Sequence, residues 1–421
     1  MKVAVVGGGS TYTPELADGF ARLRSVLPVD ELTLIDPATE RLGVVGAFCA
    51  RLFARHGHPG TVSWTSDVDK GLDGADVVLI QLRVGGQRAR ISDETFPMEL
   101  CSLGQETTGA GGLAKALRTV PVVLDIAERV AQRAAAGAWI VDFTNPVGIM
   151  TRALLDAGHR AVGLCNVAIG FQRRFAGLLG VEPSSVVLDH IGLNHLTWER
   201  AAFVDGVDLL PTLLNDHLAA VAAEVDLPPE LLASQGAVPS YYLRYFYAHD
   251  EVVRAERGEP TRGQRVTDIE NELLALYADP AVRDKPDLLM QRGGAYYSEA
   301  AVDLIASLRG VAVGSSAQAA NVRNAGIFPF LDDDAVIEVT CDVSSAGAVP
   351  RATPRPSPDL AGLIAHVSGY EELALDAALR GGRDRVYRAL LAHPLVGQHS
   401  LAEGLTDRLI AANTAHLAWT R

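Results

Sequence analysis

The first 36 residues hold the feature that most restricts the fold. A short apolar run, Lys2–Val6, leads into Gly7-Gly8-Gly9-Ser10. A helical pattern at Pro14–Arg24 follows, and then a second apolar run, Glu31–Ile35, which ends on Asp36. Strand, glycine-rich turn, helix, strand and acid in this order are typical of the βαβ unit of a doubly wound parallel sheet. We therefore expect the chain to begin with a Rossmann-like domain.

The same pattern continues beyond the first unit. Further apolar strands are predicted at Asp76–Gln81, Ala138–Phe143 and Arg160–Leu164, separated by helical patterns at Glu40–Arg55 and Leu113–Ala136. Strands that alternate with helices indicate a parallel sheet. Residues 1–170 are accordingly predicted to form the nucleotide-binding domain.

The second part of the chain, residues 171–421, follows a different pattern. Ser185–Asp205 alternates in polarity with a turn expected at Gly192, and a further antiparallel patch is expected near Ala335–Val343. From Asp359 to Leu417 the sequence is strongly helical. This indicates an α+β domain for substrate binding and oligomerisation, and the whole resembles the architecture of lactate and malate dehydrogenases.

Composition excludes several classes of protein. A net charge of −14 argues against general nucleic-acid binding, and no apolar run is long enough to predict a membrane span. The four cysteines show no CxxC spacing, which argues against a disulfide scaffold or a structural zinc cluster. We expect a cytoplasmic protein with no nucleic-acid or membrane partner.

The glycine turn predicts a dinucleotide site. Gly7, Gly8, Gly9 and Ser10 would let a pyrophosphate approach the backbone at a helix N-terminus. The third glycine of the full GxGxxG motif is absent, since Tyr12 stands there, so a plain tight turn is the alternative. Asp36 favours the nucleotide reading, because a carboxylate there accepts ribose hydroxyls and repels a 2′-phosphate. The expected cofactor is therefore NAD.

Cys165 and His195 are a candidate metal pair. Cys165 follows the strand at Arg160–Leu164, at the edge where doubly wound folds bind ligands. A buried structural cysteine and an ordinary hairpin histidine are the alternatives. Two protein ligands would leave coordination positions open for substrate oxygens, as Lewis-acid catalysis requires.

Several motifs together resemble glycoside hydrolase family 4, whose members depend on NAD and a divalent metal. They span at least residues 1–340 in order, and the closest resemblance is to the 6-phospho-β-glucosidases. The motifs are Gln105-Glu-Thr-Thr-Gly-Ala-Gly-Gly112, Asn145-Pro-Val-Gly148, Cys165-Asn166, Gly192-Leu-Asn-His195, Tyr242-Leu-Arg-Tyr245, Arg292-Gly-Gly-Ala-Tyr-Tyr-Ser298 and Asn321-Val-Arg-Asn-Ala-Gly326.

The resemblance implies a mechanism and assigns residues to it. Cys165 and His195 would hold a divalent metal, usually Mn²⁺, on the sugar's O2 and O3. NAD⁺ would take a hydride from C3, and Tyr242 would remove the C2 proton. The aglycone would leave by elimination, water would add, and the hydride would return to C3. Asn166 beside the metal cysteine, where α-specific members tend to carry an acid, favours the β anomer.

Substrate recognition is expected from arginines, whose planar donors match phosphate. The candidates are Arg83, Arg90 and Arg262, with Asn145 and Asn166 as further polar contacts, whereas Arg88 is expected on a solvated face. The expected substrate is a phosphorylated disaccharide or aryl glucoside, and the resemblance implies a homodimer or homotetramer.

Two departures from the family pattern bear on this substrate. Ala168 replaces the usual proline, and Arg323 stands where proline is usual, so a further cation near the sugar could favour another anionic group. The alternatives are an α-glycosidase or a uronate-acting enzyme of the same family, and an NAD-dependent 2-hydroxy acid dehydrogenase.

Overall fold

The central sheet of the computed structural model joins both halves of the chain. The structure describes residues 1–293, 296–312 and 316–420. The sheet order is β13-β12-β11-β6-β5-β4-β1-β2-β3. Its strands are β1 (Lys2–Val6), β2 (Glu31–Ile35), β3 (Thr61–Thr65), β4 (Val77–Ile80), β5 (Trp139–Asp142), β6 (Ala161–Gly163), β11 (Ser316–Arg323), β12 (Val336–Ser344) and β13 (Gly347–Pro350).

The order of the first six strands confirms the predicted doubly wound fold. They are all parallel, with the reversal of strand order between β1 and β4. Ligands bind at such a switch point, beyond the carboxyl ends of the strands. Strand β3 was not predicted, because this edge strand is largely exposed and lacks an apolar run.

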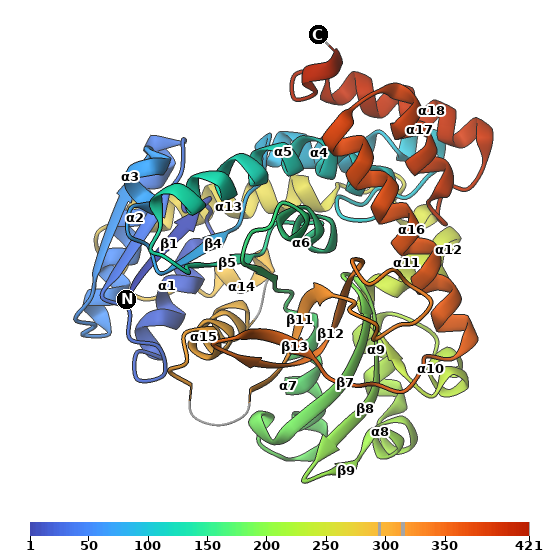
Figure 1. Ribbon diagram of the computed structural model, residues 1–421, viewed down its shortest axis with the longest axis horizontal. Coiled ribbons are helices and arrows are strands. Elements are labelled where there is room, and N and C mark those ends of the chain that lie inside the picture. Colours follow the sequence, from blue (N-terminus) through green and yellow to red (C-terminus); the bar gives the residue numbers. More distant parts are fainter. Residues whose placement is uncertain (294–295, 313–315, 421) are drawn as a thin grey trace.

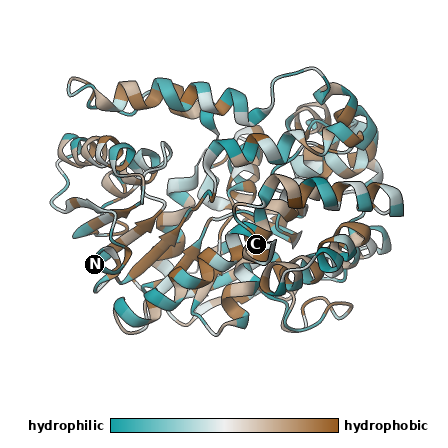
Figure 2. Ribbon diagram, turned by 90° about the horizontal axis from the view of Figure 1, so that it is seen from above, coloured by the Kyte–Doolittle hydropathy of each residue, from teal (hydrophilic) through white to brown (hydrophobic). Residues whose placement is uncertain are grey.

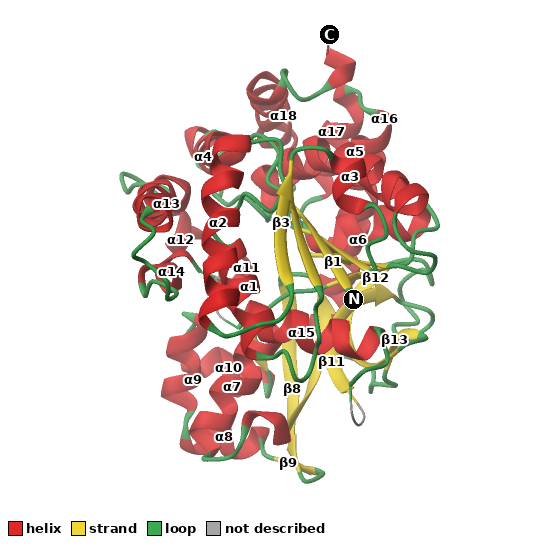
Figure 3. Ribbon diagram, turned by 90° about the vertical axis from the view of Figure 1, so that its left-hand side faces the viewer, coloured by secondary structure: helices red, strands yellow, loops and turns green. Residues whose placement is uncertain are grey.

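Helices cover both faces of this sheet (Figures 1 and 3). On one face of the sheet, α1 and α2 contact each other, and α13 packs on α2. On the other face, α5 contacts α3, α6 and α16. Figure 2 shows hydrophobic strands running between more hydrophilic helices. The helices of the first half are α1 (Thr13–Arg22), α2 (Thr39–Arg55), α3 (Val68–Leu72), α4 (Gly86–Thr95), α5 (Gly109–Arg133), α6 (Val147–Asp156) and α7 (Val167–Leu179).

The second half adds a small antiparallel sheet and many helices. In this sheet β8 (Leu196–Val204) pairs with β7 (Val186–Leu193), β9 (Val207–Asp208) and β10 (Val238–Pro239). The helices are α8 (Leu210–Asp216), α9 (Leu218–Val225), α10 (Pro229–Gln235), α11 (Arg244–Tyr247), α12 (His249–Glu256), α13 (Arg262–Ala278), α14 (Leu288–Arg292), α15 (Tyr297–Leu308), α16 (Pro358–Arg380), α17 (Arg383–Ala392) and α18 (His399–Asn413). Short 3₁₀ helices lie at η1 (Met98–Leu100), η2 (Pro183–Ser185), η3 (Tyr241–Leu243) and η4 (Ala418–Thr420).

Two details of the second half differ from expectation. The hairpin turns at Asn194-His195 rather than at Gly192, which pairs with Thr197 inside the ladder. His195 adopts φ +64°, a left-handed conformation in which histidine is enriched among non-glycine residues. The strand predicted near Ala335–Val343 joins the large sheet through β11 and β6 instead of a separate patch. The boundary at residue 170 stays a prediction.

Among the described residues, no helix has the length and apolar character that crossing a bilayer requires.

Candidate active site

The turn after β1 is shaped for close approach of a ligand. Gly7 adopts φ +88°, and a Cβ there would lie 2.4 Å from the carbonyl oxygen of Gln81. A Cβ at Gly9 would lie 2.8 Å from Cγ of Asp36. The backbone N–H groups of Gly7 and Gly8 both donate to Ile35 O at 2.9 Å, which draws the turn against the end of β2. The cradle therefore tolerates no side chain at Gly7 or Gly9.

Asp36 and Ser10 complete this turn. Asp36 Oδ2 accepts the N–H of Gly9 at 3.1 Å, and Oδ1 accepts that of Ala38 at 2.9 Å. Ser10 Oγ accepts the N–H of Tyr12 at 3.2 Å, just before α1 begins at Thr13. The carboxylate thus lies at the end of β2 beside the glycine turn, the position that a ribose-binding acid requires.

Cys165 lies buried between the end of β6 and the start of α7. Burial raises the pKa of its thiol, and Glu338 raises it further, whereas the N–H groups of Val167 and Asn166 and the side chain of Asn194 hydrogen-bond the sulfur and oppose that shift. Donors at a helix N-terminus favour thiolate, the metal-binding form. A cation at this position would supply the remaining stabilisation.

His195 lies at the tip of the β7–β8 hairpin and is also buried. Its Nδ1 lies 3.1 Å from Thr107 Oγ1, so Nε2 is the nitrogen oriented for a metal. Burial lowers the pKa of His195 to about 4, which keeps the imidazole neutral and able to ligate. Asn194 precedes His195 and hydrogen-bonds Cys165, so one residue ties the two candidate ligands together.

The donor set fits an open metal site. The described part of the chain contains no group of three or more His, Cys, Asp and Glu side chains able to hold a metal. A thiolate and one imidazole leave most coordination positions for substrate and water, as a catalytic rather than a structural centre requires.

Tyr242 lies against His195. The two rings stack with centroids 3.6 Å apart and planes 7° from parallel. Burial raises the pKa of the Tyr242 phenol well above its usual range, and Cys165 raises it further. Tyr241 is instead 41% exposed, with Arg244 over its ring. The structure thus brings Tyr242, and not Tyr241, to the Cys165–His195 pair.

Two of the predicted arginines, Arg83 and Arg90, converge on Glu106. Arg83 donates to both oxygens of Glu106, and Arg90 Nε lies 3.1 Å from Glu106 Oε1. Lys115 Nζ donates to Glu106 Oε2 at 2.9 Å. Burial opposes the charge of Glu106, but these cations hold its carboxyl pKa well below the usual range. Arg90 Nε also donates to Glu94 Oε1 at 2.8 Å, so these cations are shared between two buried carboxylates.

Arg262 lines a cavity of about 440 Å³ whose walls also include Arg90, Gln105, Tyr242 and Tyr245. Arg262 Nη2 donates to the carbonyl oxygens of Gln291 and Arg292, at 2.8 and 3.1 Å. The cavity thus runs from the predicted base to two predicted phosphate ligands.

The two asparagines lie at the ends of neighbouring strands. Asn145 follows β5, and its Oδ1 is buried without a hydrogen-bond partner in the described part of the chain. Asn166 follows β6 as the N-cap of α7. An unsatisfied buried acceptor costs free energy that a ligand donor would recover.

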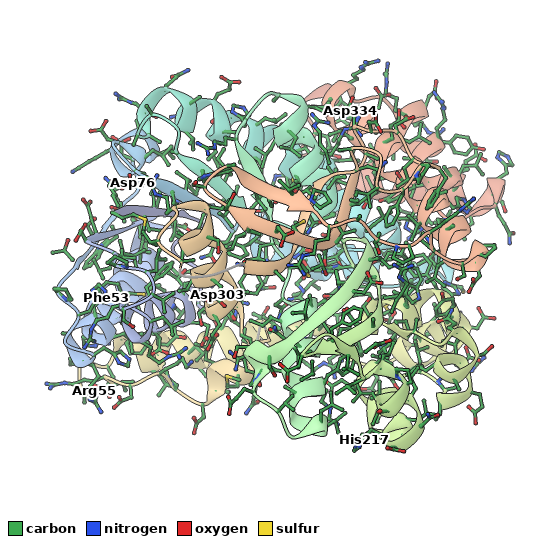
Figure 4. The ribbon with its side chains drawn as sticks, turned by 60° about the horizontal axis from the view of Figure 1, so that its bottom comes forward. Phe53, Arg55, Asp76, His217, Asp303 and Asp334 are labelled. Atoms are coloured by element: carbon green, nitrogen blue, oxygen red, sulfur yellow. The ribbon has the colours of Figure 1, made fainter. Side chains whose placement is uncertain are left out.

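The two departures from the family pattern lie in different surroundings. Arg323 binds Asp334 and Asp156, with Nη1 2.8 Å from Asp334 Oδ1 and Nη2 3.0 Å from Asp156 Oδ1. Asp334 lies at the molecular edge (Figure 4). The expectation of a further cation near the sugar is therefore wrong, because two surface carboxylates hold Arg323. Ala168 is in the first turn of α7, where proline is tolerated, and it lines a cavity together with Cys165.

Sequence reasoning missed several residues of this site. Thr107 and Glu106 lie within the Gln105–Gly112 motif, which by itself assigns them no individual role, and Lys115 follows in a helical pattern that also holds Arg118. Two cations one helical turn apart among apolar residues, Lys115 and Arg118, were the available signal. Arg88 is exposed, as expected. Gly294 and Ala295 of the Arg292–Ser298 motif lie outside the described residues.

The fold and site define a Rossmann-type protein with a Cys/His pair and a tyrosine beside the switch point. The family model for "Family 4 glycosyl hydrolase" matches residues 2–181, and that for its C-terminal domain matches residues 190–396. This chain belongs to glycoside hydrolase family 4.

Individual relatives are also similar to this chain over nearly its whole length. The probable 6-phospho-β-glucosidase of Bacillus subtilis is 36% identical over 99% of this chain and 97% of its own. The structure of the 6-phospho-β-glucosidase from Thermotoga maritima with manganese, NAD⁺ and glucose 6-phosphate has a TM-score of 0.92, with 31% identity and 99% of each chain covered. Malate dehydrogenase from Salinibacter ruber, at 18% identity, covers 91% of this chain and 99% of its own with a TM-score of 0.53. This last likeness confirms the expected fold.

Proposed function

We propose that this chain hydrolyses 6-phospho-β-glucosides, using NAD⁺ and a divalent metal, most simply Mn²⁺. The observation that carries the proposal is the stacking of Tyr242 on His195 beside Cys165, at one end of a cavity that reaches Arg90 and Arg262. The names and ligands of the relatives in Bacillus subtilis and Thermotoga maritima support it. The route would be oxidation at C3, elimination across C1–C2, water addition and reduction.

Separate residues would hold the cofactor, hold the metal and accept the proton. When bound, NAD⁺ supplies a hydride acceptor and donor, and the divalent cation supplies a Lewis acid. The turn at Gly7–Ser10 and Asp36 would hold the dinucleotide, and Cys165 and His195 would hold the cation. Tyr242 would take the C2 proton as phenolate, a form that its burial alone opposes. A cation beside the phenol lowers its pKa and makes that proton transfer possible.

Asn166 supports the β anomer. The family resemblance implies that α-specific members tend to carry an acid beside the metal cysteine, and an amide has no proton to give to a leaving oxygen at neutral pH. The α-glycosidase alternative is therefore disfavoured.

Phosphate recognition is assigned to Arg83, Arg90 and Arg262, with Asn145 donating alongside. Glu106 already engages Arg83 and Arg90, so a bound phosphate would share these donors with it. Arg90 and Arg262 both line the cavity, and a phosphate engages a cluster of arginines where a carboxylate needs about one. This supports phosphate over carboxylate at C6.

The test is hydrolysis of p-nitrophenyl β-glucoside 6-phosphate, with NAD⁺, Mn²⁺ and reductant each omitted in turn. The unphosphorylated, α-linked and uronate analogues would run alongside. We expect release that needs both NAD⁺ and metal, without net NADH. NADH formed from a 2-hydroxy acid, with no release from any glycoside, would instead establish the dehydrogenase alternative. The homo-oligomeric state and the cytoplasmic location stay predictions.

A further inference from the structure

A buried charged triad of side chains lies next to the Cys165–His195 pair. It joins Glu199 on β8, His190 on β7 and Glu338 on β12, all at most 1% exposed. His190 Nδ1 lies 2.6 Å from Glu199 Oε1, and Nε2 lies 3.1 Å from Glu338 Oε1. Because a carboxylate faces each ring nitrogen, both nitrogens must carry a proton. The ring is an imidazolium between two carboxylates.

Glu338 connects this charged triad to the candidate metal ligands. Its second oxygen, Oε2, accepts from Asn194 Nδ2 and from Asn321 Nδ2, each at 2.8 Å. Asn194 Oδ1 in turn accepts the N–H of Val147 at 3.2 Å, and the Asn194 side chain opposes the rise in the pKa of the Cys165 thiol. The orientation of Asn194, the neighbour of His195, is therefore fixed from Glu338.

We infer that Glu338, held by His190, is the positioning residue of the metal centre, orienting Asn194 so that Cys165 and His195 converge on a divalent cation. This inference rests on the proposed function, which supplies the metal. Outer residues that orient metal ligands commonly change metal affinity about 10- to 100-fold when altered.

Charge balance supports the same role. Two carboxylates and one imidazolium leave one net negative charge in the core, and a Cys165 thiolate adds a second. Buried charge without compensation is costly. A divalent cation between Cys165 and His195 would neutralise the cluster, so Glu338 acts electrostatically as well as through Asn194.

The test measures Mn²⁺ binding to the full NAD-loaded chain by calorimetry. Glu338→Gln keeps the shape but presents an amide N–H₂ to either His190 or Asn194, both of which are donors. We expect the Mn²⁺ dissociation constant to rise about 10- to 100-fold, with kcat largely recovered at saturating Mn²⁺. The control is Asn321→Ser, which removes the other donor to the same oxygen without touching Asn194 and should leave Mn²⁺ affinity close to the original.

A second variant covers the case in which Glu338→Gln does not fold. Glu199→Gln leaves Glu338 and Asn194 intact but weakens the hold on the imidazolium, and it should raise the dissociation constant in the same direction by a smaller factor. Unchanged Mn²⁺ affinity in a folded Glu338→Gln, or in Glu199→Gln when only that variant folds, would overturn the inference. Failure of the unaltered chain to bind Mn²⁺ would instead contradict the metal site of the proposed function itself, and the inference with it.

Discussion

Tyr242 and Tyr241 are neighbours in sequence with different surroundings. The ring of Tyr242 lies flat on His195, whereas Tyr241 is 41% exposed and packs edge-on against Tyr242. Through the family resemblance, the Tyr-Leu-Arg-Tyr pattern favours Tyr242 over Tyr241 as the base. It gave no indication of the stacking, because nothing in the sequence spacing relates residue 242 to residue 195.

The Tyr242→Phe variant tests the proposed base. Removing the phenol oxygen leaves the ring stack in place but no group to take the C2 proton, so kcat should fall about 10²- to 10⁴-fold with Mn²⁺ and NAD⁺ affinities retained. The matched control is Tyr247→Phe, which loses only a hydroxyl that accepts from Gln235 and should keep its activity. Equal kcat in Tyr242→Phe and the unaltered chain would remove Tyr242 from the mechanism.

The β7–β8 hairpin and β12 carry the charged triad of Glu199, His190 and Glu338. Burial opposes the charge of His190, but Glu199 and Glu338 outweigh it and raise its pKa to about 10. Periodicity predicted the hairpin. It gave no sign that β12 would pair into the large sheet and bring Glu338 to His190, since that contact spans 148 residues. Long-range pairing of this kind is set by tertiary packing.

A pH dependence of stability follows from this element. The folded pKa of His190 exceeds its unfolded value of about 6.5, so its contribution is complete below pH 6.5 and is lost as pH rises toward 10. At 1.36 kcal/mol per unit, the metal-free chain should lose about 2 kcal/mol between pH 6.5 and 8. Denaturant unfolding should show this slope in the unaltered chain and not in His190→Gln. The same slope in both would assign it to other groups.

The turn at Gly7–Ser10 gives a second prediction at this scale, that position 7 tolerates no side chain. Gly7→Ala adds a Cβ at φ +88° that meets the Gln81 carbonyl oxygen at 2.4 Å, so we expect a loss of about 2–4 kcal/mol and weaker NAD⁺ binding. Gly57→Ala is the control, because its φ is +59° but no atom lies within 4 Å of the added Cβ. It should cost about 1 kcal/mol and leave NAD⁺ affinity unchanged. Both are measured by denaturant unfolding and calorimetry.

On the scale of the whole molecule, the sequence predicted the parallel half of the sheet better than its extension. The strands of the βαβ units are continuous apolar runs buried on both faces, which is why their positions can be predicted from the sequence. Strands β11 and β13 carry small or exposed residues, so they show no comparable run. The pairing of β11 with β6 at Asn321 and Gly163 joins the two halves of the chain beside the site.

Removal of the C2 proton distinguishes the proposed route from direct displacement at C1. The most direct measurement uses p-nitrophenyl β-glucoside 6-phosphate deuterated at C2, turned over in ordinary water with NAD⁺ and Mn²⁺, with the product examined by mass spectrometry and NMR. We expect the glucose 6-phosphate formed to carry hydrogen at C2 in place of deuterium. Full retention of deuterium at C2 would contradict the proposed route and would indicate direct displacement at C1.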